Sequence, residues 1–160
     1  MALYLIRTAL AVRRENWDGP PADRPLTPEG RAQAVAIARW LSPVHVSHIL
    51  SSPRPRCVQT VTPLADLFDL EVEQLDSLLT GHDVQRVLDW LRVLPDSSVL
   101  CTHDKVITRV TEILTRQGAE LDGPVDFGKG AIWILERSAG RIERIHAVHP
   151  PVNNGLATTR

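Results

Sequence analysis

Short apolar runs alternate along the chain with longer segments in which apolar residues recur every three or four positions. Runs of strand length lie at Leu3–Ile6, Val46–Ser51 and Ser98–Thr102. Each is followed by a helical periodicity, which after the first run is carried by Ala34, Ile37, Ala38 and Leu41. Repeated strand–helix units of this kind predict a three-layer α/β/α sandwich with a mostly parallel central sheet.

Residues that typically begin or end helices define the bounds of these elements more closely. Thr27 is a typical N-cap and Pro28 suits the first helical position, so we expect the first helix to begin there and to end before Pro43. Further helices are expected over about residues 53–68, from a cap at Asp83, and through a segment that ends at Gly118. A short edge strand is expected at 71–74.

The C-terminal part of the chain has a different pattern. Ala131–Glu136 and Arg141–Val148 alternate in polarity and are joined by the turn residues Ser138-Ala139-Gly140, which predicts a C-terminal antiparallel hairpin. The length suits one domain, which we expect over 1–149, with 150–160 forming a flexible tail.

Composition excludes several function classes. With 160 residues and a formal net charge of −1, the chain has no general polyanion-binding surface, so we expect no nucleic-acid partner. No apolar run approaches the roughly 18 residues that span a bilayer, and we expect neither membrane insertion nor a secretion signal. Cys57 and Cys101 lie in apolar segments, which favours two buried thiols over a disulfide and a cytoplasmic location.

Basic side chains follow three of the predicted strands. Arg7 ends the first, Arg54 and Arg56 follow the second in SSPRPRCVQT, and His103 follows the third in CTHDK. Ligands of open α/β sheets bind beyond the carboxyl ends of the strands. Guanidinium groups and helix N-termini at that edge favour an anion, and a phosphoryl group in particular.

These segments together resemble a known family. LYLIR, RPLTPEGRAQA, SSPRPRCVQT and VLCTHDKVI occur in an order similar to that of the histidine phosphatase superfamily, also called phosphoglycerate mutase-like. The resemblance runs from Leu3 to about Val148. It is strongest to small SixA-like phosphohistidine phosphatases and to the phosphatase domain of actinobacterial Nudix-fused proteins, which the hairpin KGAIWILERSAGRIERI resembles.

The resemblance implies roles for particular residues. Arg7 and Arg56 match the two arginines that bind the phosphoryl group, and His103 matches the second pocket histidine, which stabilises the transition state. The implied reaction is hydrolysis of a phosphohistidine or another phosphomonoester through a phosphohistidine intermediate, with a phosphorylated small molecule or a phosphoprotein as the partner. The family chemistry needs no metal or cofactor, and we expect none.

Thr8 departs from the family pattern because it occupies the position of the nucleophilic histidine. A hydroxyl needs an adjacent base, whereas a neutral imidazole does not. We therefore expect this chain to be inactive or strongly impaired. Two explanations stay open: a natural pseudophosphatase that binds a phosphorylated ligand, and an altered form of an active enzyme.

Other candidates carry open alternatives. No clear general acid stands out, although Asp76 and Asp83 are possible and Asp83 is better suited to capping a helix. Arg24 either lines the mouth of the pocket or fastens its loop, and Trp17 either covers the substrate or packs. A sugar-phosphate mutase is disfavoured because such enzymes tend to carry long insertions. The oligomeric state is not predicted.

Overall fold

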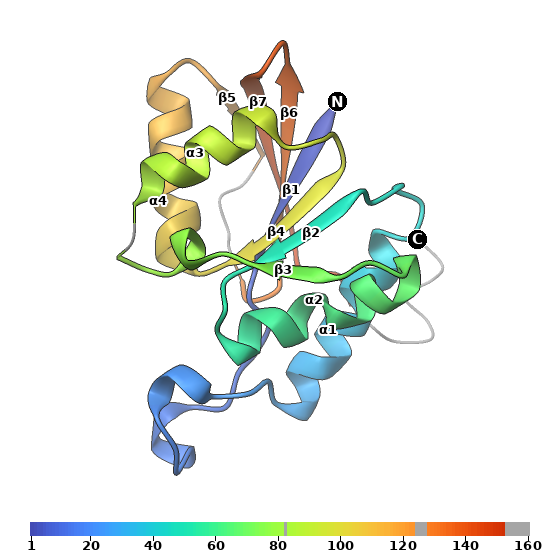
Figure 1. Cartoon of the computed structure of the whole chain (residues 1–160), viewed down its shortest axis with the longest axis vertical. Helices are drawn as coiled ribbons and strands as arrows, with labels where there is room; N and C mark the ends of the chain where they lie inside the picture. Colours follow the sequence, from blue (N-terminus) through green and yellow to red (C-terminus); the bar gives the residue numbers. More distant parts are fainter. Residues whose placement is uncertain (82, 124–127, 153–160) are drawn as a thin grey trace.

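The computed structural model describes residues 1–81, 83–123 and 128–152. A seven-stranded sheet forms its centre, in the order β3-β2-β4-β1-β6-β7-β5 (Figure 1). The strands are β1 (Ala2–Arg7), β2 (His48–Ser51), β3 (Val72–Gln74), β4 (Ser98–Thr102), β5 (Glu120–Asp122), β6 (Ile132–Ser138) and β7 (Arg141–Val148). Pairing is parallel across β3, β2, β4 and β1 and between β7 and β5, and antiparallel from β1 through β6 to β7. This architecture confirms the predicted fold class.

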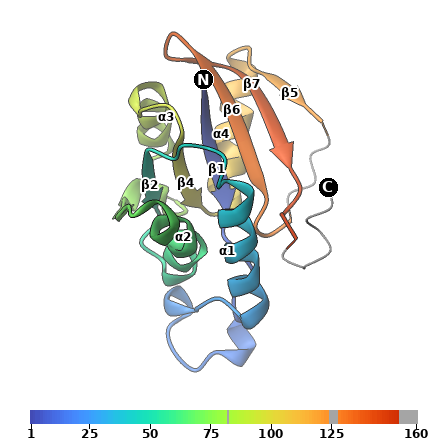
Figure 2. The same ribbon diagram turned by 90° about the vertical axis from the view of Figure 1, so that its right-hand side faces the viewer.

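Helices cover both faces of the sheet (Figure 2). Four long ones are α1 (Pro28–Trp40), α2 (Pro55–Phe68), α3 (Val84–Val93) and α4 (Asp104–Arg116). Alternate residues of β1 enter opposite layers of the core: Tyr4 and Ile6 pack with α1 and α2, and Leu3 and Leu5 pack with α3 and α4. The period of two along a buried strand thus produces the two hydrophobic layers.

The expected end signals act as predicted. The Thr27 hydroxyl oxygen accepts a hydrogen bond from the Gly30 N–H at 3.0 Å, and Asp83 Oδ1 accepts one from the Gln85 N–H at 2.9 Å. Gly118 has a φ of 107°, which suits the end of α4. Asp83 is therefore a helix cap, and His82 lies outside the described residues.

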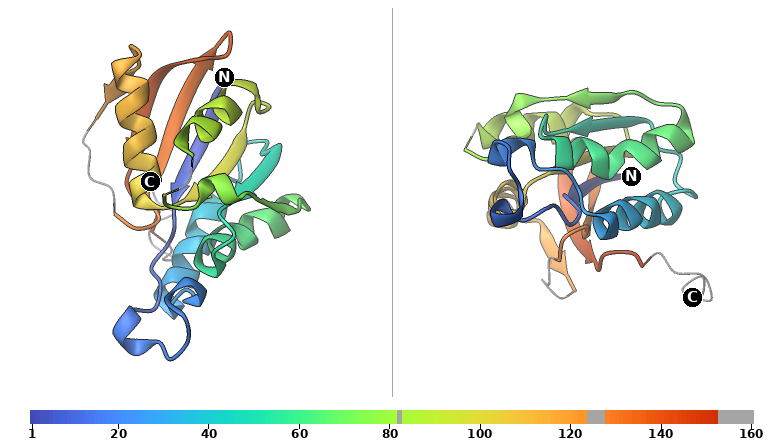
Figure 3. Two further views of the ribbon diagram at one scale, coloured as in Figure 1. Left: turned by 60° about the vertical axis from the view of Figure 1, so that its left-hand side comes forward. Right: turned by 90° about the horizontal axis from the view of Figure 1, so that it is seen from below.

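The hairpin is confirmed, with Ala139 and Gly140 at φ values of 52° and 74° in its turn. Residues 12–26 form a loop, which contains the short 3₁₀ helices η1 (Arg14–Asn16) and η2 (Pro21–Asp23). Figure 3 shows this loop projecting from the end of the molecule at which β1 terminates. The predicted flexible tail spans residues 150–160. Of these, 153–160 lie outside the described part of the chain, so the tail stays a prediction.

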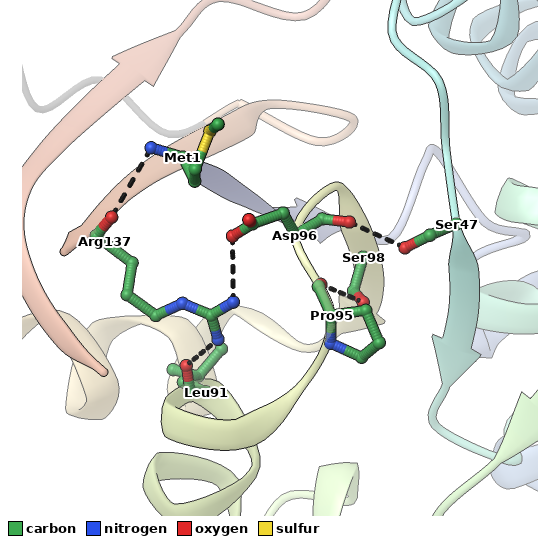
Figure 4. A network of polar contacts seen from close by, with 7 residues as sticks. All are labelled: Met1, Ser47, Leu91, Pro95, Asp96, Ser98 and Arg137. Atoms are coloured by element: carbon green, nitrogen blue, oxygen red, sulfur yellow. Dashed lines mark hydrogen bonds and ion pairs between the residues drawn. The ribbon is translucent and has the colours of Figure 1, made fainter. Parts of the chain in front are cut away.

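The opposite end of the sheet is held by a polar network around Arg137 (Figure 4). Arg137 Nη2 lies 3.0 Å from Asp96 Oδ1, and Arg137 Nη1 donates to the Leu91 carbonyl oxygen at 2.9 Å. Ser47 Oγ donates to the Asp96 carbonyl oxygen at 2.8 Å. These bonds connect β6, the end of α3 and the segment before β2 at the edge where β1 begins.

Two further features of the chain concern disulfide bonding and membrane-spanning helices. Cys57 and Cys101 are both free and buried, as predicted. Within the described residues, no helix has the length and apolar character that a bilayer crossing requires.

Candidate functional site

The carboxyl ends of β1, β4 and β2 lie side by side because of the strand register. Arg7 pairs with Thr102, and Ser51 pairs with Cys101. The Thr8 N–H continues this register by donating to the Thr102 carbonyl oxygen at 3.1 Å. The three basic strand ends found in the sequence are therefore neighbours along one edge of the sheet.

An open cavity of about 590 Å³ lies at this edge. Of the six site residues that the sequence suggested, Arg7, Thr8, Arg24, Arg56 and His103 line it. Trp17 is absent from this lining as the described residues define it. The Trp17 indole N–H instead donates to the Pro20 carbonyl oxygen at 3.0 Å, and Gly19 lies against the ring. The indole thus packs within its own loop.

Two helices begin at the cavity. Arg54 is the N-cap residue of α2 and Arg56 lies in its first turn, while His103 is the N-cap residue of α4. Neither cap residue has a side-chain capping hydrogen bond. Backbone N–H groups and the positive ends of both helix dipoles therefore lie near the cavity, an arrangement that favours bound anions.

Arg56 carries an unused donor. Its Nη1 atom is buried and has no hydrogen-bond partner within the described residues. Burial lowers the pKa of the Arg56 guanidinium, and the positive charges of Arg24 and Arg54 lower it further. A buried donor without a partner is costly, and an anion in the cavity is a suitable acceptor for it.

His103 is oriented by side chains that the sequence did not single out. The ring is 8 % exposed, and its Nε2 atom lies 2.9 Å from the buried Ser52 Oγ. Ser52 Oγ also accepts a hydrogen bond from the Arg54 N–H at 3.3 Å. Cys57 Sγ lies 3.7 Å from Nε2 and 3.9 Å from Nδ1. Ser52 thus connects the imidazole to the start of α2.

The two thiols lie beneath this group. Hydrogen bonding from Cys101 lowers the pKa of Cys57 to about 5, and His103 contributes in the same direction. Burial raises the pKa of the Cys101 thiol. Both side chains are 0 % exposed, and neither is among the described residues that line the cavity.

Thr8 has a modest set of contacts. Its hydroxyl donates to the Ala9 carbonyl oxygen at 3.4 Å, and the backbone carbonyl of Thr8 accepts from the Gly130 N–H at 3.3 Å. His103 Nε2 is already engaged by Ser52. The hydrogen bonds of these two residues therefore do not join the Thr8 hydroxyl to the imidazole.

The sequence left two roles open for Arg24, lining the mouth of the pocket and fastening its loop, and the side chain does both. It lines the cavity, and it fastens its loop by donating from Nε to the Pro21 carbonyl oxygen and from Nη1 to the Val12 carbonyl oxygen, each at 3.0 Å. The acceptors in this fastening are backbone carbonyl groups. The Arg24 side chain therefore lines the cavity while it holds the loop in place.

Further polar side chains line the cavity, namely Arg14, Arg54, Thr80, Asp104, Lys105 and Lys129. Arg14 was missed because it lies in a loop with no periodicity. Among the described residues, Asp104 is the acid in the lining. Neither Asp76 nor Asp83 lines this cavity as described. No group of three or more His, Cys, Asp and Glu residues within the described residues is arranged to hold a metal ion.

Comparison with known proteins gives consistent matches. Residues 3–79 match the model of the histidine phosphatase superfamily (branch 1). An 8-oxo-(d)GTP phosphatase of Mycolicibacterium smegmatis is 30% identical over 157 residues, which cover 93% of this chain and 48% of that protein. The chain thus spans about half the length of that curated relative.

Solved structures extend the likeness in fold to the rest of the chain. The protein histidine phosphatase SixA complexed with tungstate matches with a TM-score of 0.76 and 22% identity, covering 98% of this chain and 99% of that chain. A mycobacterial glucosyl-3-phosphoglycerate phosphatase matches with a TM-score of 0.64 and 16% identity, covering 96% and 99% respectively. The family match over residues 3–79 and the 30% identity to the M. smegmatis relative show that the chain resembles the histidine phosphatase superfamily, and the solved structures show that it shares the fold.

Proposed function

We propose that the cavity binds a phosphoryl group. We also propose that this chain comes from a group of phosphatases that hydrolyse phosphohistidines or other phosphomonoesters. The observation that carries the proposal is the convergence of Arg7, Arg56 and His103 on one cavity, with a buried Arg56 Nη1 that lacks an acceptor in the described residues. Two guanidinium groups and an imidazole suit a tetrahedral dianion. The likeness to a SixA structure with bound tungstate, another tetrahedral oxyanion, supports the same reading.

In this proposal Thr8 stands where the family has its nucleophilic histidine. Attack by the Thr8 hydroxyl would require a base, but the hydroxyl bonds to Ala9 and the imidazole bonds to Ser52. We therefore propose that this chain is inactive or strongly impaired as a hydrolase. Loss of a covalent nucleophile typically lowers turnover by several orders of magnitude.

The test compares this chain with Thr8→His on a phosphohistidine and on an aryl phosphate, and Thr8→Ala serves as the matched control. We expect Thr8→His to turn over at least about a thousandfold faster than the parent, and Thr8→Ala to equal the parent. A parent rate within about tenfold of an active Thr8→His variant would contradict the proposed role of position 8.

A second candidate is a non-catalytic module that recognises a phosphorylated ligand. The contacts of Thr8 favour it, because the anion-binding side chains are present while the hydroxyl lacks a base. Anion binding by the parent, together with no measurable hydrolysis by either the parent or Thr8→His, would support this candidate. Mutase activity of Thr8→His, with transfer of the phosphoryl group to a second position on the substrate, would support neither.

The partner that we propose is a phosphorylated small molecule or a phosphoprotein, in a cytoplasmic setting that suits the two free thiols. The M. smegmatis relative is named for its action on 8-oxo-(d)GTP, but this chain covers 48% of it. The shared half alone does not assign that substrate to this chain. The class of ligand is better argued from the cavity itself.

A further inference from the structure

The cavity holds more positive charge than one phosphoryl group needs. Among the described residues, seven cationic side chains line it, against one carboxylate, that of Asp104. They are Arg7, Arg14, Arg24, Arg54, Arg56, Lys105 and Lys129. The whole chain has a formal net charge of −1, so the cavity concentrates a charge that the rest of the surface does not share.

Five of these side chains are additional to the phosphoryl-binding set. We call Arg14, Arg24, Arg54, Lys105 and Lys129 the cationic rim. They come from separate segments: the loop of residues 12–26, the start of α2, the start of α4 and the turn before β6. Positive charges from several segments thus surround one opening. This arrangement suits a ligand that extends from the phosphoryl site toward the mouth of the cavity.

No ion pair within the described part of the chain involves the cationic rim. Among residues 1–81, 83–123 and 128–152, the ion pairs belong to Arg13, Arg92, Arg116, Arg137 and Arg144, none of which lines the cavity. The cations also repel one another. Burial lowers the pKa of the Lys129 ammonium, and the charges of Arg7 and Arg24 lower it further. A ligand with several negative charges would relieve this repulsion.

We propose that the ligand of this cavity is a small molecule with a chain of two or more linked phosphoryl groups, as in a nucleoside diphosphate or triphosphate. Its terminal phosphoryl group lies at Arg7, Arg56 and His103, and the rest of the phosphoanhydride chain lies against the cationic rim. This inference rests on the proposed phosphoryl site. It extends that proposal from a single phosphoryl group to a polyphosphate.

The dimensions and the lining favour such a small molecule over a phosphoprotein. A volume of about 590 Å³ falls within the range of roughly 300–1,000 Å³ that small-molecule sites occupy. No Phe, Tyr or Trp ring lines the cavity as the described residues define it. The phosphoryl chain therefore supplies most of the binding free energy, and a nucleobase adds little.

Calorimetric titration of this chain with orthophosphate, pyrophosphate and inorganic triphosphate tests the inference. We expect affinity to rise with each phosphoryl group, by at least about tenfold in total, and triphosphate binding to weaken steeply as salt is added. GTP, ATP and inorganic triphosphate should bind within about fivefold of one another, because the base adds little. A preference of about a hundredfold for one nucleotide would contradict recognition through the chain.

Charge-removal variants locate the effect. Lys105→Gln combined with Lys129→Gln should weaken triphosphate binding by about tenfold and orthophosphate binding by less than about threefold. The matched control combines Arg31→Gln with Arg86→Gln, which removes the same charge from exposed positions outside the cavity lining. This control should leave both affinities unchanged.

The outcomes separate the two proposals. Orthophosphate binding without any gain for triphosphate, or equal losses in the rim and control variants, would overturn the polyphosphate inference and leave the phosphoryl site standing. Tighter binding of a singly phosphorylated peptide than of triphosphate would overturn it in favour of a phosphoprotein. Failure of every anion to bind would overturn the phosphoryl site, and the inference with it.

Discussion

Ser52 Oγ lies 2.9 Å from His103 Nε2, so a buried hydroxyl at the end of β2 orients the imidazole that follows β4. The same oxygen accepts from the Arg54 N–H at 3.3 Å. One serine thereby fixes the imidazole relative to the helix that carries Arg56. The contact therefore lies between the starts of α2 and α4.

Ser52→Ala should weaken orthophosphate binding by about three- to tenfold, since loss of one hydrogen bond costs about 0.5–1.5 kcal/mol. The imidazole would lose its fixed orientation while keeping its position in the chain. Titration calorimetry measures the effect, with Ser42→Ala as a control at an exposed site. Unchanged affinity in Ser52→Ala would show that His103 needs no such support.

Gly30 allows α1 to approach the segment that follows Thr8. A Cβ atom at this position would lie 2.0 Å from the Leu10 carbonyl oxygen, which is backbone and also accepts from the Thr27 N–H at 3.0 Å. Gly30→Ala should therefore lower the free energy of unfolding by about 1–3 kcal/mol. Urea denaturation checks this, and Ala32→Ser on the exposed side of α1 should stay within about 0.5 kcal/mol. Equal stability of Gly30→Ala and the parent would contradict the close approach.

Arg137 stabilises the fold without serving the site. Its side chain is 10 % exposed, and it lies at the edge of the sheet where β1 begins, whereas Arg7 ends that strand. Arg137→Ala should lower the free energy of unfolding by about 1–2 kcal/mol, because it removes hydrogen bonds to Asp96 and Leu91. Orthophosphate affinity of the folded variant should equal that of the parent. A selective loss of affinity would place Arg137 in the site.

The two thiols should be inert in the native protein. Both are fully buried, so a water-soluble disulfide reagent should reach neither until the chain opens. Two thiols per chain should react after denaturation, and their native reaction rate should rise in the destabilised Gly30→Ala variant. Rapid reaction of the parent under native conditions would show that Cys57 or Cys101 is accessible.

Hydrophobic periodicity predicted the sandwich, its parallel part and the hairpin because the buried elements are long or strongly patterned. β4 matches its predicted bounds, Ser98–Thr102, since all five of its residues are buried. β5 escaped prediction because Glu120–Asp122 has two charged residues and one leucine, and it is a strand only through pairing with β7. β2 begins at His48, two residues later than expected.

Site residues could be predicted from the sequence where they follow the ends of strands. They could not be predicted where their position depends on the course of a loop. Arg7 and His103 follow from the register of parallel strands, and the family resemblance adds Arg56. Arg14 reaches the cavity through the course of a loop that has no periodicity, and Ser52 acts through a tertiary contact with a residue 51 positions away. For Trp17 the sequence left both a cover over the substrate and a packed side chain open, and the indole is bonded within its own loop.

A crystal structure of this chain with orthovanadate tests the central claim most directly. The account predicts a tetrahedral anion held by the guanidinium groups of Arg7 and Arg56 and by the His103 ring, beside the Thr8 side chain. Vanadate bound only elsewhere on the surface at a saturating concentration, with those three side chains contacting other protein groups, would contradict it.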